Sequence, residues 1–154
     1  MTSKPILAGF FIGIGSGIIL GLVLKFLQAL TGIKVYVLLL NVDFIPYFGD
    51  VHWSEWAEFL FHLVVSTILG ILFVFLIRIF RLSGRAIWLT ASVLTFPAFL
   101  LYFPLSLLAI KEVPDVFDPG GITLWFIGHV IYGATLPILY FMWKKQKSRS
   151  EWVS

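Results

Sequence analysis

The pattern of hydrophobic and polar positions is dominated by four long apolar stretches, which short polar segments separate. They cover residues 5–24, 57–77, 86–110 and 122–143. A helix needs about 20 apolar residues to cross the hydrocarbon core of a bilayer, and each stretch reaches that length. The pattern therefore predicts an all-α integral membrane protein, a four-helix bundle that forms a single transmembrane domain over residues 1–154.

A shorter apolar run, residues 35–40, lies between the first and second long stretches. The polar residues Asn41 and Asp43 and the helix breaker Pro46 follow it. Six residues are too few to cross a bilayer. We expect this short interfacial segment to lie along the membrane surface, or to dip into the membrane and return.

Three prolines fall inside the predicted spans. Pro97, Pro104 and Pro137 each remove one backbone hydrogen bond, so we expect them to bend their helices. Bent helices can open a cavity, or they can pack closely around the bend. Both outcomes stay open at this point.

The overall composition agrees with a membrane protein. Hydrophobic residues make up 60% of the chain and charged residues only 12%, whereas soluble domains carry about 25% charged residues. The net charge of +3 is small, and the charged residues are sorted by their position along the chain. We therefore expect the lipid bilayer as a partner and no nucleic acid.

The distribution of Lys and Arg predicts the orientation of the spans. One side holds most of the basic residues, namely Lys4, Arg78, Arg81, Arg85, Lys144, Lys145, Lys147 and Arg149, with Glu151 as its acid. The other side holds Lys25, Lys34, Lys111, Asp43, Asp50, Glu55, Glu58, Glu112, Asp115 and Asp118. Short cytoplasmic loops are enriched in Lys and Arg, so both termini should be cytoplasmic.

Glycines recur at every fourth position of the first stretch. Gly9, Gly13, Gly17 and Gly21 therefore share one face of the predicted helix. Because this face carries no side chains, another helix can approach it closely, and such packing is a main source of helix association in lipid. We expect the glycine face to pack against a helix of the same chain, a second copy or a partner membrane subunit.

The second span carries a polar stripe. Glu55, Glu58, His62, Ser66 and Gly70 follow one another at intervals of three or four residues, so they share a helix face. A polar face of this kind is expected to point at protein or at a cavity, because lipid cannot hydrogen-bond to it.

The fourth span carries a second histidine at a similar depth. His62 lies roughly 8 Å below the outer boundary and His129 roughly 10 Å, at about 1.5 Å per helical residue. If the second and fourth spans are neighbours, the two imidazoles could meet. The residues proposed to form an outward-facing pocket at this level are Lys25, Glu58, His62, Tyr102, His129 and Tyr132.

Two interpretations of these polar residues remain open. Ionisable groups at membrane depth cost about 2.5–3.5 kcal/mol each on insertion scales, which favours a functional site. However, buried His, Ser and Tyr also hydrogen-bond neighbouring helices, for about 0.6 kcal/mol each. Lys25 could reach the headgroups or pair with a nearby glutamate.

The sequence carries no recognised catalytic or cofactor motif. The absence of cysteine excludes disulfides and Cys-ligated metal centres. No G-x-S-x-G or phosphate-binding G-x-x-x-x-G-K-[ST] motif occurs, and no Asp lies in a predicted span. The histidines and glutamates could hold a metal ion or haem, but no H-E-x-x-H or Glu-x-x-His motif occurs. We expect no enzyme, no metal and no cofactor.

Several short motifs resemble the YagU-like family of small bacterial inner-membrane proteins. They are the glycine-rich first span, Phe61-His62-Leu63, Phe103-Pro104-Leu105 and Gly128-His129. The resemblance implies a four-span protein of the bacterial inner membrane, linked to acid or envelope stress. The family pattern places a further histidine where this chain has Phe99, so a three-histidine metal site is not expected here.

Two hypotheses for the function follow. The first is a non-enzymatic scaffold or accessory subunit whose glycine face packs helices together. The second is a transporter, channel or sensor that binds a proton, an ion or a small solute in the polar pocket. A cavity that reaches both His62 and His129 would favour the second hypothesis, and side chains closed against each other would favour the first.

Overall fold

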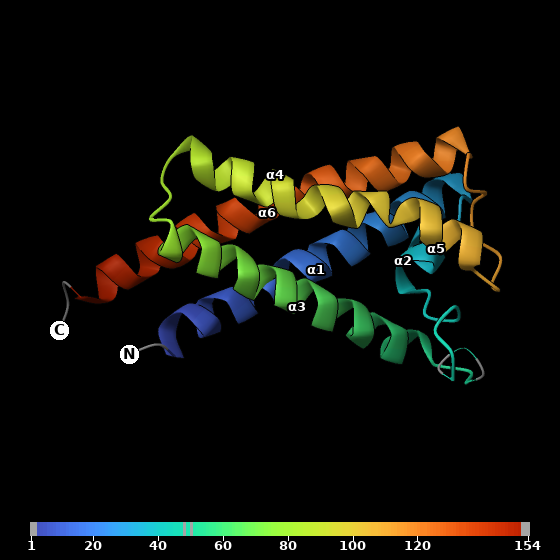
Figure 1. The fold of residues 1–154 in the computed structure, drawn as a ribbon, viewed down its shortest axis with the longest axis horizontal. Coiled ribbons are helices and arrows are strands. Elements are labelled where there is room, and N and C mark those ends of the chain that lie inside the picture. The colour runs from blue at the N-terminus through green and yellow to red at the C-terminus, as the bar shows by residue number, and fades with distance from the viewer. Residues whose placement is uncertain (1–2, 48, 50, 152–154) are drawn as a thin grey trace.

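The computed structural model describes residues 3–47, 49 and 51–151, and this part of the chain is all-helical, without strands (Figure 1). The helices are α1 (Ser3–Thr31), α2 (Val35–Leu40), α3 (Glu55–Ile79), α4 (Arg85–Leu100), α5 (Tyr102–Leu108) and α6 (Pro119–Glu151). Four segments are long and apolar enough to cross a membrane, namely Pro5–Thr31, Glu55–Ile79, Arg85–Leu108 and Pro119–Gln146. The prediction of an all-α protein with four spans is confirmed.

The first span is longer than its apolar pattern indicated. The predicted stretch 5–24 stops before Lys25, but α1 continues to Thr31 and adds roughly 10 Å of helix. Lys and Gln are good helix formers, so polar residues did not end the helix. Gly32 ends it, with a φ of 76° and a backbone hydrogen bond of 2.8 Å to the Gln28 carbonyl.

The second and fourth spans begin earlier than predicted because polar residues cap them. Ser54 accepts a hydrogen bond from the Ala57 backbone at 3.3 Å, so α3 begins at Glu55 and not at residue 57. Asp118 accepts hydrogen bonds from the backbone N–H groups of Gly120 and Gly121, and α6 begins at Pro119 and not at residue 122.

The third span is interrupted near its prolines. It runs over Arg85–Leu108 and not 86–110, and Leu101 separates α4 from α5. Pro104 has no N–H to offer to the carbonyl of Leu100, which explains a break at this point. By contrast, Pro137 lies inside the continuous helix α6.

The packing order of the spans leaves a wedge between α3 and α4. Helix α1 packs along α3 and also against α6, and α6 packs in turn against α4. Helices α3 and α4 meet near the loop 80–84 and separate toward the opposite end of the bundle (Figure 1). Helix α1 begins and α6 ends at the same end as that loop.

The short helix α2 lies at the open end of this wedge. Its residues Val35 and Leu38 are fully buried, and it contacts α1, α3, α5 and α6. The side-chain Oε1 of Gln28 accepts hydrogen bonds from the backbone N–H groups of Tyr36 (2.9 Å) and Val37 (3.2 Å), which would otherwise lack partners at the start of α2. The predicted interfacial segment is therefore a helix covered by protein, and its level in a membrane remains a prediction.

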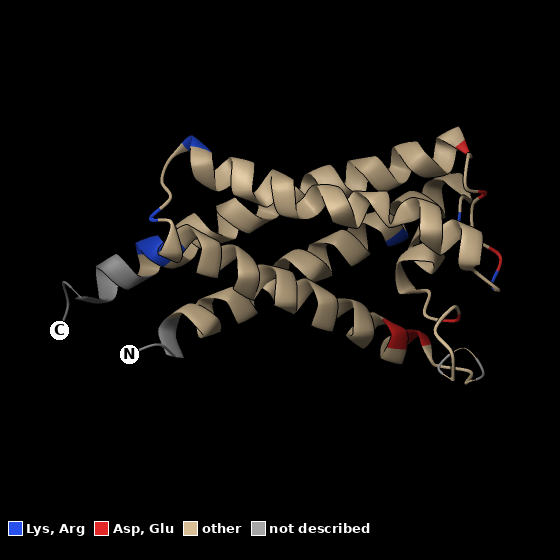
Figure 2. Ribbon diagram, in the orientation of Figure 1, with Lys and Arg blue, Asp and Glu red and all other residues tan. Residues whose placement is uncertain are grey.

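Charge is sorted between the two ends of the bundle. Arg78, Arg81 and Arg85 lie at the α3–α4 loop, near the end of α6. At the opposite end lie Asp43, Glu55, Glu58, Glu112, Asp115 and Asp118, together with Lys25, Lys34 and Lys111 (Figure 2). The predicted topology also relied on Asp50, which lies outside the described residues, and on Lys4, Lys147, Arg149 and Glu151, whose side chains are not described.

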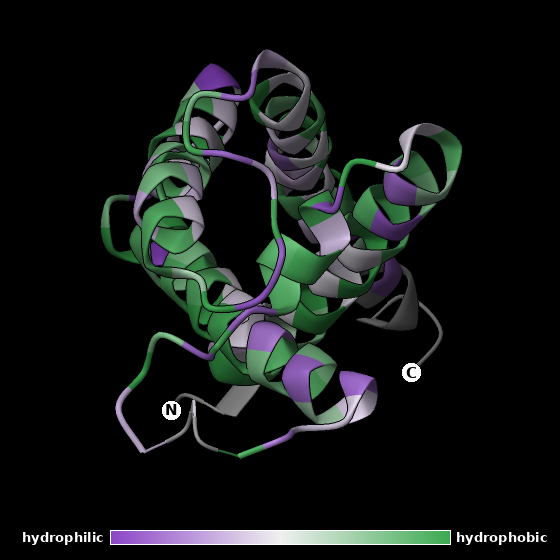
Figure 3. Cartoon of the chain, turned by 90° about the vertical axis from the view of Figure 1, so that its right-hand side faces the viewer, coloured by the Kyte–Doolittle hydropathy of each residue, from purple (hydrophilic) through white to green (hydrophobic). Residues whose placement is uncertain are grey.

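The outer faces of the helices are apolar. Leu22, Leu60, Ile68, Leu89 and Val93 each expose more than half of their surface. Viewed along the bundle from the α2 end, the hydrophilic residues gather in the loops and the helices behind them are mostly hydrophobic (Figure 3). Lipid, and not water, is the medium that suits such a surface.

Candidate functional site

The four glycines of the predicted glycine face, Gly9, Gly13, Gly17 and Gly21, all face α3. A Cβ added to Gly9 would lie 2.5 Å from the Ile71 Cα, and one added to Gly13 would lie 2.6 Å from the Thr67 Cα. Gly70 of α3 faces Gly13 in the same way. These are backbone atoms and cannot move aside, so the two helices touch along their main chains here.

The other two glycines lie beneath side chains of α3. Gly17 faces Ser66, whose Oγ would be 2.7 Å from an added Cβ, and Gly21 faces the Phe59 ring. The glycine face is therefore occupied by α3 of the same chain. Its use by a second copy or a partner subunit, which the sequence left open, would require α3 to leave it.

Two polar residues of α3 form hydrogen bonds to α1 along the glycine face. The Ser66 Oγ donates to the Gly13 carbonyl at 2.7 Å, and the His62 Nε2 lies 3.0 Å from the Gly17 carbonyl. A helical carbonyl has a second lone pair, so these bonds form without breaking the α1 ladder. They place the predicted polar stripe at the base of the wedge between α3 and α4.

A cavity of about 220 Å³ lies in this wedge. We call it the histidine cavity. Its polar lining residues are Asn41, Glu58, His62, Ser66, His129 and Tyr132, and its other lining side chains are aliphatic or aromatic. It is bordered by α1, α2 and the chain that follows it, α3, the α4–α5 segment and α6.

Four of the six predicted pocket residues line the histidine cavity, namely Glu58, His62, His129 and Tyr132. Lys25 does not, because its Nζ pairs with Glu55 Oε1 at 2.5 Å, at the first residue of α3. Tyr102 does not either, because it is fully buried and its hydroxyl donates to the Asp115 carbonyl at 2.8 Å. The predicted pocket is corrected accordingly.

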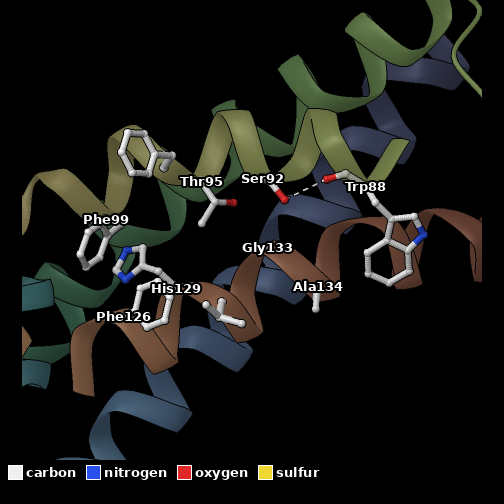
Figure 4. A pocket seen from close by; sticks show the side chains of 10 residues that line it. Trp88, Ser92, Thr95, Phe99, Phe126, His129, Gly133 and Ala134 are labelled. Carbon is white, nitrogen blue, oxygen red and sulfur yellow. Dashed lines mark hydrogen bonds between the residues drawn. The ribbon is translucent and has the colours of Figure 1, made fainter. Parts of the chain in front are cut away.

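His129 stands between the histidine cavity and a second space. Its side chain is 4% exposed, its Nδ1 lies 2.9 Å from the Trp125 carbonyl and its ring centroid is 4.4 Å from that of Trp125. It also lines a groove of about 390 Å³ between α4 and α6. Figure 4 shows His129 beside Phe99 and Phe126 at one end of this groove, with Trp88 at the other.

Tyr132 links α6 to the polar stripe. Its hydroxyl lies 3.0 Å from the Ser66 Oγ, and both side chains are almost completely buried. Through Ser66 this contact continues to the carbonyl of Gly13 on α1. Three spans therefore meet in one hydrogen-bonded layer at the histidine cavity.

A hollow of about 570 Å³, which we call the outer basin, lies above the histidine cavity. Its charged lining residues are Lys25, Lys34, Glu55, Glu58 and Lys111. Glu58 pairs with Lys111 and lines both spaces. This ion pair therefore lies at the boundary between the outer basin and the histidine cavity.

Tyr36 of α2 also lines the outer basin. Its hydroxyl donates to Glu55 Oε1 at 3.1 Å, and the Lys25 ammonium lies 5.1 Å from its ring centroid. Burial raises the pKa of Tyr36 to about 12, and the hydrogen bond and negative charge of Glu55 act in the same direction. The phenol is therefore a neutral donor at physiological pH.

Sequence reasoning missed the residues that close the bundle at the end where α2 lies. Asn41 lines the histidine cavity, and Asp43 Oδ2 accepts hydrogen bonds from the backbone N–H groups of Ile110 (3.0 Å) and Lys111 (2.6 Å). Asp43 thus ties the chain after α2 to the loop that follows α5. The only signal was the position of two polar residues directly after a short apolar run.

No group of three or more His, Asp or Glu side chains suited to a metal ion occurs in the described part of the chain. No family model matches the chain, and no curated protein or solved structure is similar enough to count as a match. The resemblance to the YagU-like family, with its link to acid or envelope stress, stays a prediction from sequence motifs.

Proposed function

We propose that this chain is a multi-pass protein of the bacterial inner membrane with both termini in the cytoplasm. Four apolar helices of spanning length support the membrane assignment. The arginines at the α3–α4 loop and the lysines near the end of α6 support the orientation, because basic residues favour the cytoplasmic side. In this arrangement the outer basin opens to the outside.

We propose further that the protein binds a small solute in the histidine cavity, as a transporter or sensor and not as a scaffold alone. The observation that carries this proposal is one cavity of about 220 Å³ bordered by both His62 and His129. A purely structural role for these histidines would favour side chains closed against each other. Small-molecule sites in proteins typically combine an apolar wall with a few converging polar groups.

Thiol accessibility tests this proposal, because the chain contains no cysteine of its own. Ala98 lines the histidine cavity, whereas Val93 lies on the same span, is 68% exposed and lines neither the cavity nor the groove. A charged methanethiosulfonate reagent added from outside should modify Ala98→Cys and leave Val93→Cys unmodified in lipid. The two variants share a helix, so they differ in what their side chains face.

An unreactive thiol at position 98 would contradict the binding proposal and favour the scaffold. Correct insertion is checked independently, by the expression level and by a single symmetric peak in gel filtration. Rapid modification at position 93 would contradict the assignment of that face to lipid.

A further inference from the structure

The hydrogen-bond directions around the histidine cavity determine what kind of ligand it can accept. The inference below rests on the proposed function, and it concerns the chemical class of the ligand. Its starting point is that a carbonyl oxygen can only accept a hydrogen bond, so each partner of a carbonyl must carry the proton.

This rule fixes the neutral form of His62. The Nε2 of His62 lies 3.0 Å from the carbonyl oxygen of Gly17, so Nε2 carries the hydrogen. In a neutral imidazole the other nitrogen is then a bare acceptor. The Nδ1 of His62 has no hydrogen-bond partner among the described residues, and it is not one of the fully buried unpaired atoms.

His129 has the opposite tautomer and the same consequence. Its Nδ1 lies 2.9 Å from the carbonyl oxygen of Trp125 and so carries the hydrogen. Its Nε2 is the bare acceptor, and within the described part of the chain it has no hydrogen-bond partner. Each neutral histidine therefore donates its single N–H to a backbone carbonyl, and its other ring nitrogen keeps a lone pair that can accept a hydrogen bond.

The same rule fixes the hydrogen-bond directions of the Ser66 and Tyr132 hydroxyl groups. The single hydroxyl hydrogen of Ser66 goes to the Gly13 carbonyl at 2.7 Å. In the 3.0 Å contact between Ser66 and Tyr132, the tyrosine must then be the donor. The Tyr132 oxygen retains an acceptor lone pair, and the Trp125 indole N–H is already used by the Phe99 carbonyl at 3.0 Å.

The charge at the histidine cavity comes from the Glu58 carboxylate of the boundary ion pair. Glu58 is the one charged residue that lines it. Its Oε1 accepts from Lys111, which lines the outer basin and not the cavity. Asn41 Nδ2 is the one lining donor without a partner in the described structure, and it is fully buried. The accessible polar groups are therefore acceptors beside a carboxylate.

The remaining walls favour an organic cation of modest size. Engineered apolar cavities of about 150 Å³ hold a benzene molecule, and this cavity is about 220 Å³. Phe44, Phe61 and Trp125 line it, and aromatic faces attract ammonium groups. We propose that the histidine cavity binds a small protonated amine, whose N–H groups donate to His62, His129 and Tyr132 and whose hydrocarbon part packs on the apolar walls.

A matched ligand series tests the proposal on the purified full-length protein in lipid nanodiscs. Cyclohexylamine, cyclohexanol and cyclohexanecarboxylate share one ring and differ in the polar group. Calorimetry at neutral pH should show that the amine binds roughly tenfold or more tightly than the alcohol, because hydrogen bonds to charged groups are the stronger ones. The carboxylate should not bind, since it offers no donor.

The substitution Glu58→Gln tests whether the Glu58 carboxylate contributes to amine binding, and Glu55→Gln is its control. Both variants remove one carboxylate from the outer basin, but only Glu58 lines the histidine cavity. We expect Glu58→Gln to weaken amine binding roughly tenfold and to leave alcohol binding within about twofold, whereas Glu55→Gln should change neither. Equal effects of the two variants on the amine would overturn the assignment of its site.

The other outcomes are also decisive. Tighter binding of the alcohol or the carboxylate would overturn the amine assignment and leave the proposed function standing. Binding of Zn²⁺ in place of the amine would do the same, because two imidazole lone pairs can also hold a metal. If none of the three ring compounds binds while Ala98→Cys is modified, the inference fails alone; if Ala98→Cys is also unreactive, the proposed function fails with it.

Discussion

Tyr36 shows at the scale of one residue how α2 is held at the open end of the wedge between α3 and α4. Its hydroxyl donates to Glu55 of α3, and Lys25 of α1 lies near its ring, so one phenol connects three helices. Its pKa is raised to about 12, above the usual value of about 10. Between pH 10 and 12 the folded protein keeps a proton that the unfolded chain releases, so the stabilisation from this group is complete below pH 10 and is lost as the pH rises toward 12.

Tyr36→Phe should therefore remove a phenol that titrates near pH 12. The measurement is the ultraviolet absorbance of phenolate as a function of pH for the parent protein and the variant. Their difference should rise with a midpoint close to pH 12 while the protein stays folded. A midpoint near 10 would show that the hydroxyl is solvated and that α2 is not held in this way.

The sequence predicted individual site residues where helix geometry alone decides their place. Glu58, His62 and Ser66 were placed together by their spacing on one helix, and all three line the histidine cavity. Lys25 and Tyr102 were assigned to the same pocket by depth alone. Depth does not set side-chain direction, and their partners Glu55 and Asp115 draw them elsewhere.

At the scale of elements, the glycine face sets how closely α1 and α3 pack. Gly13→Ala would place a methyl group 2.6 Å from the Thr67 Cα, so the two backbones would have to separate. We expect a loss of about 1–3 kcal/mol, the usual range for overpacking. The matched control is Gly15→Ala on the same helix, where the added methyl meets only the flexible side chain of Leu139 at 3.0 Å.

Gly15→Ala should be neutral or slightly stabilising, because alanine favours helix by about 0.8–1 kcal/mol over glycine. Unfolding of both variants in mixed detergent micelles, followed by circular dichroism, measures the difference. Equal midpoints for Gly13→Ala and Gly15→Ala would mean that the backbones of α1 and α3 are not in contact.

Apolar length predicted the four long elements, whereas the packing of the short helix α2 depends on tertiary contacts. The four spans follow directly from residue hydropathy, but the extension of α1 to Thr31 depends on Gly32, which ends the helix. Residues 35–40 were expected to lie along the membrane surface, or to dip into the membrane and return, because six apolar residues cannot cross it; this placement stays a prediction. The burial of α2 depends on the Gln28 side chain and on the wedge between α3 and α4, which are tertiary features.

The sorted charges predict the orientation of the whole molecule. Phe117 lies in the loop before α6 and is 80% exposed, and Ser83 lies in the exposed loop between α3 and α4. In intact cells, a membrane-impermeant thiol reagent should modify Phe117→Cys and spare Ser83→Cys until the membrane is permeabilised. The reverse pattern would invert the topology and direct the outer basin to the cytoplasm.

The contact of α1 with α3 has a mechanical consequence for the whole molecule. Where main chains touch there is no side chain to change rotamer, so these two helices form a stiff pair. Gly128 of α6 instead meets the flexible side chains of Leu20 and Leu24, and the loop before α4 includes Gly84 with a φ of 55° and open space around it. Any change in the volume of the histidine cavity must therefore come from its other walls, which belong to α2 and the chain that follows it, the α4–α5 segment and α6, and not from the α1–α3 pair.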